Sequence, residues 1–170
     1  MARLGAMIVL GIDPGMAETG YGVVDAGGRM RALDQGVIAT PARAAPAERL
    51  AEIHDRVAAL IDRHAPDAAA LEDLFVGANP RTILSVGQAR GAVLAACGRA
   101  GLEAAGYPPA EVKQIVCGFG RAGKAQMRRM VGAVLALEGP PRSDHAADAL
   151  AVAVCHAQRS RTARMRAVAG

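Results

Sequence analysis

The order of strand-like and helix-like segments is the feature that most constrains the fold of this chain. An apolar run over residues 7–12 stops at the turn Asp13-Pro14-Gly15, and a second apolar run follows over residues 20–24. Gly27-Gly28 marks a hairpin before a third strand, expected over residues 33–40. The chain therefore begins as a sheet of strands joined by short turns.

Helical periodicity follows these strands. Between Pro46 and Pro66, apolar residues recur at spacings of three and four, which predicts an amphipathic helix with one buried face. Residues 68–71 form a short apolar strand. Asn79-Pro80 then has the chemistry of a helix start, and we expect this helix to run to about Arg99 and to end at Gly101.

The last third of the chain alternates in the same way. Residues 102–107 predict another strand, and residues 111–116 a short helical or extended stretch. A glycine-rich loop over residues 118–123 precedes two helices, expected over about 124–137 and 143–157. Residues 159–170 contain four arginines without apolar periodicity, which predicts a basic, flexible tail. Together these segments indicate an α/β fold, a mixed central sheet flanked by helices, in one domain over residues 1–158.

Composition limits the partners of this chain. Its 170 residues suit a single domain. Lys and Arg (20) outnumber Asp and Glu (16), and a net charge of +4 suits a polyanionic partner. No apolar run approaches the roughly 20 residues of a membrane span, so we expect no membrane anchor. The three cysteines form no CxxC pair, which is typical of a reducing cytosol, and we expect a cytoplasmic protein.

Acidic residues occupy the ends of two predicted strands. Asp13 follows the first apolar run and Glu72 follows residues 68–71. Either acid alone would suit an ordinary turn, but two at strand ends favour a site. A third, Asp148, lies one turn inside an alanine-rich helix. Helical spacing brings both His145 (i, i+3) and Asp144 (i, i+4) beside Asp148 and does not choose between them.

This set of side chains points to a metal-dependent reaction. Three carboxylates with one imidazole suit Mg²⁺ or Mn²⁺. Two such ions about 3.5–4 Å apart activate a water and stabilise the leaving oxygen in a phosphodiester displacement. The predicted reaction class is hydrolysis of a nucleic-acid backbone.

Five segments, in order and spacing, resemble the RuvC family of Holliday-junction resolvases, and the similarity covers roughly residues 7–158. They are GIDPG (11–15) with TGYG (19–22), LEDLF (71–75), GQARG (87–91), VKQ (112–114) and AADALA (146–151). The resemblance implies an RNase H-like fold and a homodimer with one active site per subunit. It also implies paired, metal-dependent nicks across four-way junction DNA, in recombination and DNA repair, with the branch-migration proteins RuvA and RuvB as partners.

The resemblance also implies roles for single residues. The catalytic acids of the family fall on Asp13, Glu72 and Asp148, and the fourth metal-site position falls on His145, with two Mg²⁺ or Mn²⁺ ions expected per site. Many relatives have Asp at that fourth position and others have His. The histidine removes one negative charge, which shifts the expected metal preference toward Mn²⁺.

Candidate DNA contacts come from the same resemblance. The aromatic residue matching Phe75 stacks on an unpaired base, a contact worth about 1–3 kcal/mol. Lys113 and Lys124 match basic positions that face DNA, and the backbone amides of residues 118–123 between them suit phosphates. The arginines that extend this basic surface as candidates are Arg81, Arg90, Arg121, Arg128 and Arg129.

Three other functions compete with junction resolution. An RNase H-like, Holliday-resolvase-like nuclease of RNA processing shares the early Ile-Asp-Pro-Gly turn, but it lacks the segments at 87–91 and around Lys113. An actin-like sugar kinase or ATPase needs two such domains and a second glycine-rich phosphate motif, for which 170 residues are too few. A catalytically inactive junction-binding module would not need metal-competent side chains at every expected site position.

Overall fold

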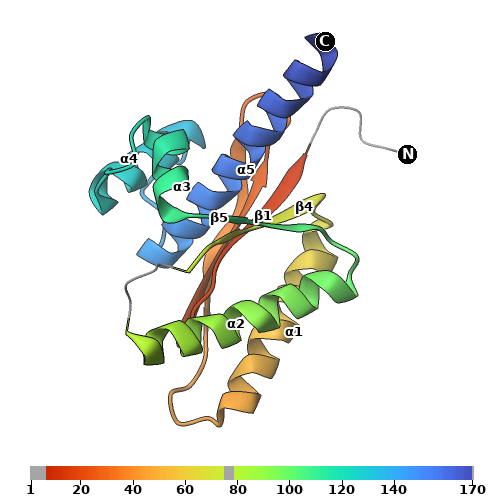
Figure 1. Ribbon diagram of the computed structural model, residues 1–170, viewed down its shortest axis with the longest axis vertical. Coiled ribbons are helices and arrows are strands. Elements are labelled where there is room, and N and C mark those ends of the chain that lie inside the picture. The colour runs from red at the N-terminus through yellow and green to blue at the C-terminus, as the bar shows by residue number, and fades with distance from the viewer. Residues whose placement is uncertain (1–6, 75–78, 170) are drawn as a thin grey trace.

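The computed structural model describes residues 7–74 and 79–169 of the chain (Figure 1). Five strands form one sheet in the order β3-β2-β1-β4-β5. They are β1 (Ile8–Asp13), β2 (Glu18–Asp25), β3 (Arg31–Ala39), β4 (Ala68–Glu72) and β5 (Ala104–Tyr107). The first three strands are antiparallel, whereas β4 is parallel to β1 and β5 is parallel to β4. The predicted mixed sheet is confirmed.

Helices cover both faces of this sheet (Figure 1). One layer contains α1 (Pro46–His64) and α2 (Pro80–Arg99), and the other contains α3 (Pro109–Cys117), α4 (Lys124–Val134) and α5 (Asp144–Ala169). Successive side chains of β1 point to opposite faces, so Leu10 packs with the first layer and Val9 with the second. A strand buried on both sides explains why residues 7–12 are continuously apolar.

Helix starts follow the predicted chemistry. The Asn79 side chain accepts a hydrogen bond from the Thr82 amide at 3.0 Å, and Pro80 occupies the first helical position of α2. Ser143 Oγ accepts a hydrogen bond from the Ala146 amide at 3.0 Å at the start of α5. Ser143, not Asp144, is therefore the capping residue of α5.

Two helix ends differ from prediction. The helix α4 ends at Val134 rather than near Leu137, and Ala136 adopts a left-handed backbone with φ of 50°. The last helix was expected to end near Ala157, and this is wrong because α5 continues to Ala169. Alanine and arginine have high helix propensity, so the helix persists without apolar periodicity. Residues 161–168 are exposed on all sides.

Two glycines let α5 lie directly against the strand ends. A Cβ atom on Gly11 of β1 would collide with the carbonyl oxygen of Ala149, and one on Gly20 of β2 with the carbonyl oxygen of His145. Only glycine permits this approach. The first turns of α5 are thereby placed next to Asp13, at the end of β1.

Among residues 7–74 and 79–169, no helix combines the length and the apolar character needed to cross a membrane.

Candidate active site

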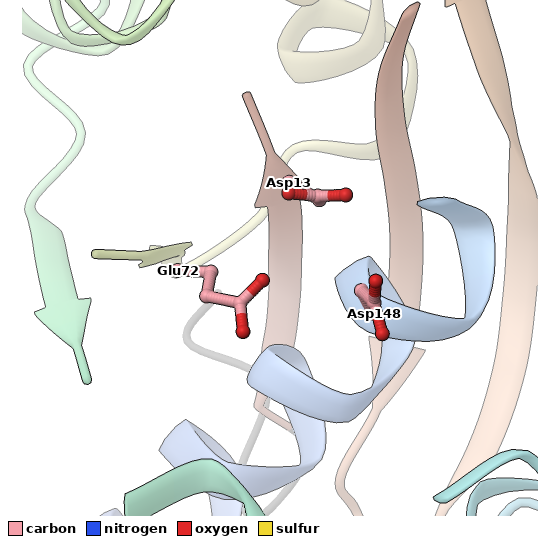
Figure 2. Close-up of side chains that lie close together, drawn as sticks. All are labelled: Asp13, Glu72 and Asp148. Atoms are coloured by element: carbon pink, nitrogen blue, oxygen red, sulfur yellow. The ribbon is translucent and has the colours of Figure 1, made fainter. Parts of the chain in front are cut away.

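Three carboxylates from three elements converge at one end of the sheet. Asp13 and Glu72 end the adjacent parallel strands β1 and β4, which pair Ile12 with Leu71 one residue earlier. Asp148 approaches from the second turn of α5 (Figure 2). One oxygen of each carboxylate lies within 4.8 Å of the others, and all three residues are partly buried. Carboxylate oxygens in this number and spacing suit a hard divalent cation.

His145 joins this cluster through Asp13. Its Nδ1 lies 2.9 Å from Asp13 Oδ2, and its Nε2 lies 3.3 Å from Glu18 Oε2. Asp144 points elsewhere, and its Oδ1 accepts a hydrogen bond from Arg128 Nη1 at 2.9 Å. Of the two candidates for the fourth position, His145 contacts an acid of the cluster, whereas Asp144 pairs with Arg128 and acts on Asp148 through its charge.

The cluster concentrates negative charge. Burial, and after it the neighbouring charges of Asp13 and Asp148, raise the pKa of Glu72 to about 8, against the opposing effect of Lys113 and Lys124. Burial and the charge of Asp13 raise the pKa of Asp148 to about 6. The carboxylates repel one another when all are ionised, so the site favours a proton or a cation between them.

Asp13 and His145 shift each other in opposite directions. Burial raises the pKa of Asp13, although the hydrogen bond and charge of His145 oppose this rise. Burial lowers the pKa of His145, but the hydrogen bond and charge of Asp13, with the charges of Glu18 and Asp148, reverse this effect, and the net pKa is raised. The imidazole therefore lies among negatively charged side chains, which favour its protonated form.

Both lysines of the chain face the acids. Lys113 of α3 and Lys124 of α4 line a cavity of about 130 Å³ together with Glu72 and Asp148. Lys124 also borders a groove of about 610 Å³ lined by Arg128 and Arg129. Positive side chains thus continue from the acidic cluster along α4, as a polyanionic strand would require.

A second cavity opens from the cluster toward α2. Asp13, Glu72 and His145 form one wall of this space of about 410 Å³, and Thr82, Ile83 and Val86 form part of the other. Asp13 and Glu72 therefore line a cleft between the end of the sheet and α2.

The other residues predicted to contact DNA differ in their exposure and in their contacts. Arg81 is exposed in the first turn of α2, and Arg121 is exposed between α3 and α4. Phe75 lies outside the described residues, so its predicted stacking stays a prediction. Arg90 and Arg128 form ion pairs with Asp73 and Asp144, and their predicted DNA contacts stay predictions.

Sequence reasoning missed Glu18 and the inward orientation of Arg90. The antiparallel register of β1 and β2 pairs Asp13 with Gly20, which brings the start of β2 close to the site. The short turn at residues 14–17 between two apolar runs was the signal that could have identified Glu18.

This arrangement defines an RNase H-like nuclease, with acids at the ends of two parallel strands and a third on a helix against the sheet. The family described as "Crossover junction endodeoxyribonuclease RuvC" matches residues 9–156. A protein of that name from Moorella thermoacetica is 55% identical over 152 residues, covering 89% of this chain and 91% of the relative. Its namesake from Thermomicrobium roseum is 51% identical over 159 residues, covering 94% and 98%.

A solved structure supports the same relationship. The Thermus thermophilus RuvC in complex with a Holliday junction substrate has a TM-score of 0.89 and 40% identity, covering 92% of this chain and 96% of that one. The chain belongs to the RuvC family, and the predicted RNase H-like fold is confirmed.

Proposed function

We propose that this chain is a structure-specific endodeoxyribonuclease that resolves Holliday junctions by metal-dependent hydrolysis of the DNA backbone, in recombination and DNA repair. One observation carries this proposal: the oxygens of Asp13, Glu72 and Asp148 converge within 4.8 Å in a member of the RuvC family. The junction-bound Thermus relative supports four-way junction DNA as the substrate. Nothing favours the RNA-processing alternative.

The donor set fits divalent cations. Three carboxylate oxygens within 4.8 Å are hard ligands, and the raised pKa of Glu72, about 8, reflects its burial and then the like charges of Asp13 and Asp148, which a cation would neutralise. We propose two Mg²⁺ or Mn²⁺ ions held by Asp13, Glu72, Asp148 and His145. When bound, such ions supply an activated water and stabilise the leaving oxygen.

The protein's own residues hold the acids in place and balance the charge around the scissile phosphate. The acids lie on two strands and a helix, elements rigid enough to hold their geometry. Lys113 and Lys124 face Glu72 and Asp148 across the same cavity, where their ammonium groups would bind phosphate oxygens of the cleaved strand. They also oppose the rise in the pKa of Glu72, which favours its ionised, metal-binding form.

DNA binding extends over the surrounding basic surface. We propose that Arg81 and Arg121 contact phosphates on either side of the site and that Phe75 stacks on an unpaired base. Exposure of both arginines supports the first statement. The second has its support in the family resemblance.

A homodimer is proposed through α2. Five residues of this helix follow the a and d positions of a heptad, Leu84, Gly87, Gly91, Leu94 and Gly98. Leu84 is 64% exposed and Leu94 is 40% exposed, and a Cβ atom on any of the three glycines would meet open space. Glycine in a helix costs about 1 kcal/mol relative to alanine, a cost that close approach of a second helix explains.

The remaining expectations come from the sequence pattern and, for the partner proteins, from the resemblance. We propose residues 1–158 as the nuclease domain and 159–170 as a basic C-terminal segment, RuvA and RuvB as partners, and the cytoplasm as the place of action. All three cysteines are free in the structure, as expected in a reducing compartment.

Cleavage of synthetic four-way junctions tests the proposed function. Linear duplex DNA and a structured RNA serve as parallel substrates, each with Mg²⁺ and with Mn²⁺. Asp13→Asn, Glu72→Gln and Asp148→Asn should each abolish cutting while leaving junction binding largely intact, because neutralising a ligand removes metal rather than basic surface. Asp62→Asn, an exposed acid on α1, is the matched control. Preference for RNA, or near-normal cutting by the three variants, would refute the proposal.

A further inference from the structure

Arg90 of α2 turns toward the end of β4 rather than toward solvent. Its Nη1 donates a hydrogen bond to the backbone carbonyl of Glu72 at 3.1 Å, and its Nη2 lies 2.8 Å from Asp73 Oδ1. Only 21% of the Arg90 side chain is exposed. The two nitrogens of one guanidinium thus hold two consecutive residues, the first of which belongs to the acidic cluster.

The neighbouring strand leaves room for this contact. Gly106 of β5 pairs with Leu71, the residue before Glu72. A Cβ atom on Gly106 would collide with the Asp73 carboxylate and lie 3.0 Å from Arg90 Nη2. The Asp73 amide also donates a hydrogen bond to the Tyr107 carbonyl at 2.8 Å. The exit of β4 is therefore fixed from β5 and from α2 at the same time.

Glu72 needs this support more than an ordinary strand end does. Its carboxylate lies among those of Asp13 and Asp148, and the mutual repulsion of three ionised acids acts to push them apart. Glu72 is also the last residue of β4, so the strand supports its backbone only on the N-terminal side. A planar guanidinium binding two acceptors restricts the backbone in a way that a single ammonium cannot.

We propose that Arg90 is a positioning residue for catalysis, which holds the Glu72-Asp73 strand end so that the Glu72 carboxylate stays in the acidic cluster. This inference rests on the proposed function, in which Glu72 binds metal. Asp73 anchors the guanidinium, and the absence of a side chain on Gly106 is what allows the pair to form.

The competing role for Arg90 is direct contact with DNA phosphates, as its place on a basic surface suggests. The two roles differ in their dependence on charge. A phosphate contact is largely preserved by lysine and contributes to the salt dependence of binding. The contact of the Arg90 guanidinium with Glu72 and Asp73, which we call the brace, is lost when lysine replaces arginine. Its loss leaves the salt dependence of DNA binding unchanged.

Arg90→Lys, Asp73→Asn and Gly106→Ala test the brace, with Arg99→Lys in the last turn of the same helix as the matched control. Mn²⁺ affinity of the DNA-free protein is measured by titration calorimetry, beside junction cleavage, metal-free junction binding at several salt concentrations, and thermal melting to verify folding. Loss of an outer-sphere partner typically costs about 10–100-fold in metal affinity or activity, and we expect this range for Arg90→Lys. Asp73→Asn should weaken Mn²⁺ binding in the same direction, and adding Arg90→Lys to it should cost little more.

Wild-type Mn²⁺ affinity and cleavage in folded Arg90→Lys and Asp73→Asn proteins would overturn the inference. So would a reduced salt slope of junction binding in Arg90→Ala. If Arg90→Lys does not fold, Asp73→Asn, which retains the side-chain size, decides the question alone. Glu72→Gln is measured in parallel: if it binds Mn²⁺ and cuts normally, the proposed function fails, whereas an inactive Glu72→Gln beside a normal Arg90→Lys refutes only the brace.

Discussion

His145 Nδ1 lies 2.9 Å from Asp13 Oδ2, so the first turn of α5 is linked directly to the end of β1. The adjacent acid, Asp144, pairs instead with Arg128 of α4, whose Nη1 lies 2.9 Å from its Oδ1. This pair of contacts separates two side chains that helical spacing alone treats as equivalent partners of Asp148.

We predict that His145→Ala is severely impaired in cleavage, whereas Asp144→Ala is active. The Asp144→Ala substitution removes a partly exposed ion pair, worth about 0–1 kcal/mol, rather than a metal ligand. His145→Asp should retain cleavage and improve activity with Mg²⁺ relative to Mn²⁺, because it adds a hard carboxylate. Junction cleavage rates with each metal check these outcomes. An inactive Asp144→Ala beside an active His145→Ala would show that the acid, not the imidazole, is the fourth ligand.

Glu72 should make the metal-free protein less stable as pH rises. Its ordinary pKa of 4.5 applies in the unfolded chain, and its pKa in the folded protein is about 8. The folded state therefore favours the protonated form, a contribution that is fully present below pH 4.5 and lost as pH rises through about 8. Glu72→Gln removes this dependence and should raise the Tm in alkaline solution, by about 2–4 °C for each kcal/mol of repulsion relieved.

Thermal melts of metal-free wild type and Glu72→Gln at about pH 6 and about pH 9 measure this effect. Glu138→Gln, the same substitution at an exposed position after α4, is the control. Mg²⁺ should raise the Tm of the wild type more than that of Glu72→Gln, because ligand binding stabilises only the form that binds it. A Tm difference that does not change with pH would contradict the pKa shift of Glu72.

Lys113→Ala and Lys124→Ala should weaken junction binding and flatten its salt dependence. Each phosphate contact that is lost lowers the slope of log affinity against log salt by about one unit. Binding titrations without metal at several salt concentrations test this, with Arg63→Ala on the exposed face of α1 as the control. Slopes equal to that of the control would indicate that the two lysines are merely solvated.

The convergence of Asp13 and Glu72 could be predicted because both follow apolar segments, and adjacent parallel strands end at one edge of a sheet. Helical spacing could not choose between His145 and Asp144, because the rotation of α5 is set by backbone contact at Gly11 and Gly20, and only the family resemblance favoured His145. For the same reason the orientation of the Arg90 side chain was not predictable. It depends on Gly106, which lies sixteen residues later on the strand β5. The length of α5 was missed because its last turns have no buried face.

The exposed heptad positions of α2 provide the last prediction. If a second copy of the chain packs against this stripe, a charge introduced at Leu94 would be buried in the interface without a partner, at a large free-energy cost. Leu94→Glu should therefore sediment as a monomer in analytical ultracentrifugation where the wild type sediments as a dimer. Leu33→Glu on β3 is a matched control, because Leu33 is 41% exposed and Leu94 is 40% exposed, and it should stay dimeric. The Leu94→Glu protein, which keeps every residue of its acidic cluster, should also lose the pairing of nicks on opposite strands of a junction. A wild type that is monomeric at all concentrations, or a Leu94→Glu protein that remains dimeric, would exclude α2 as the interface.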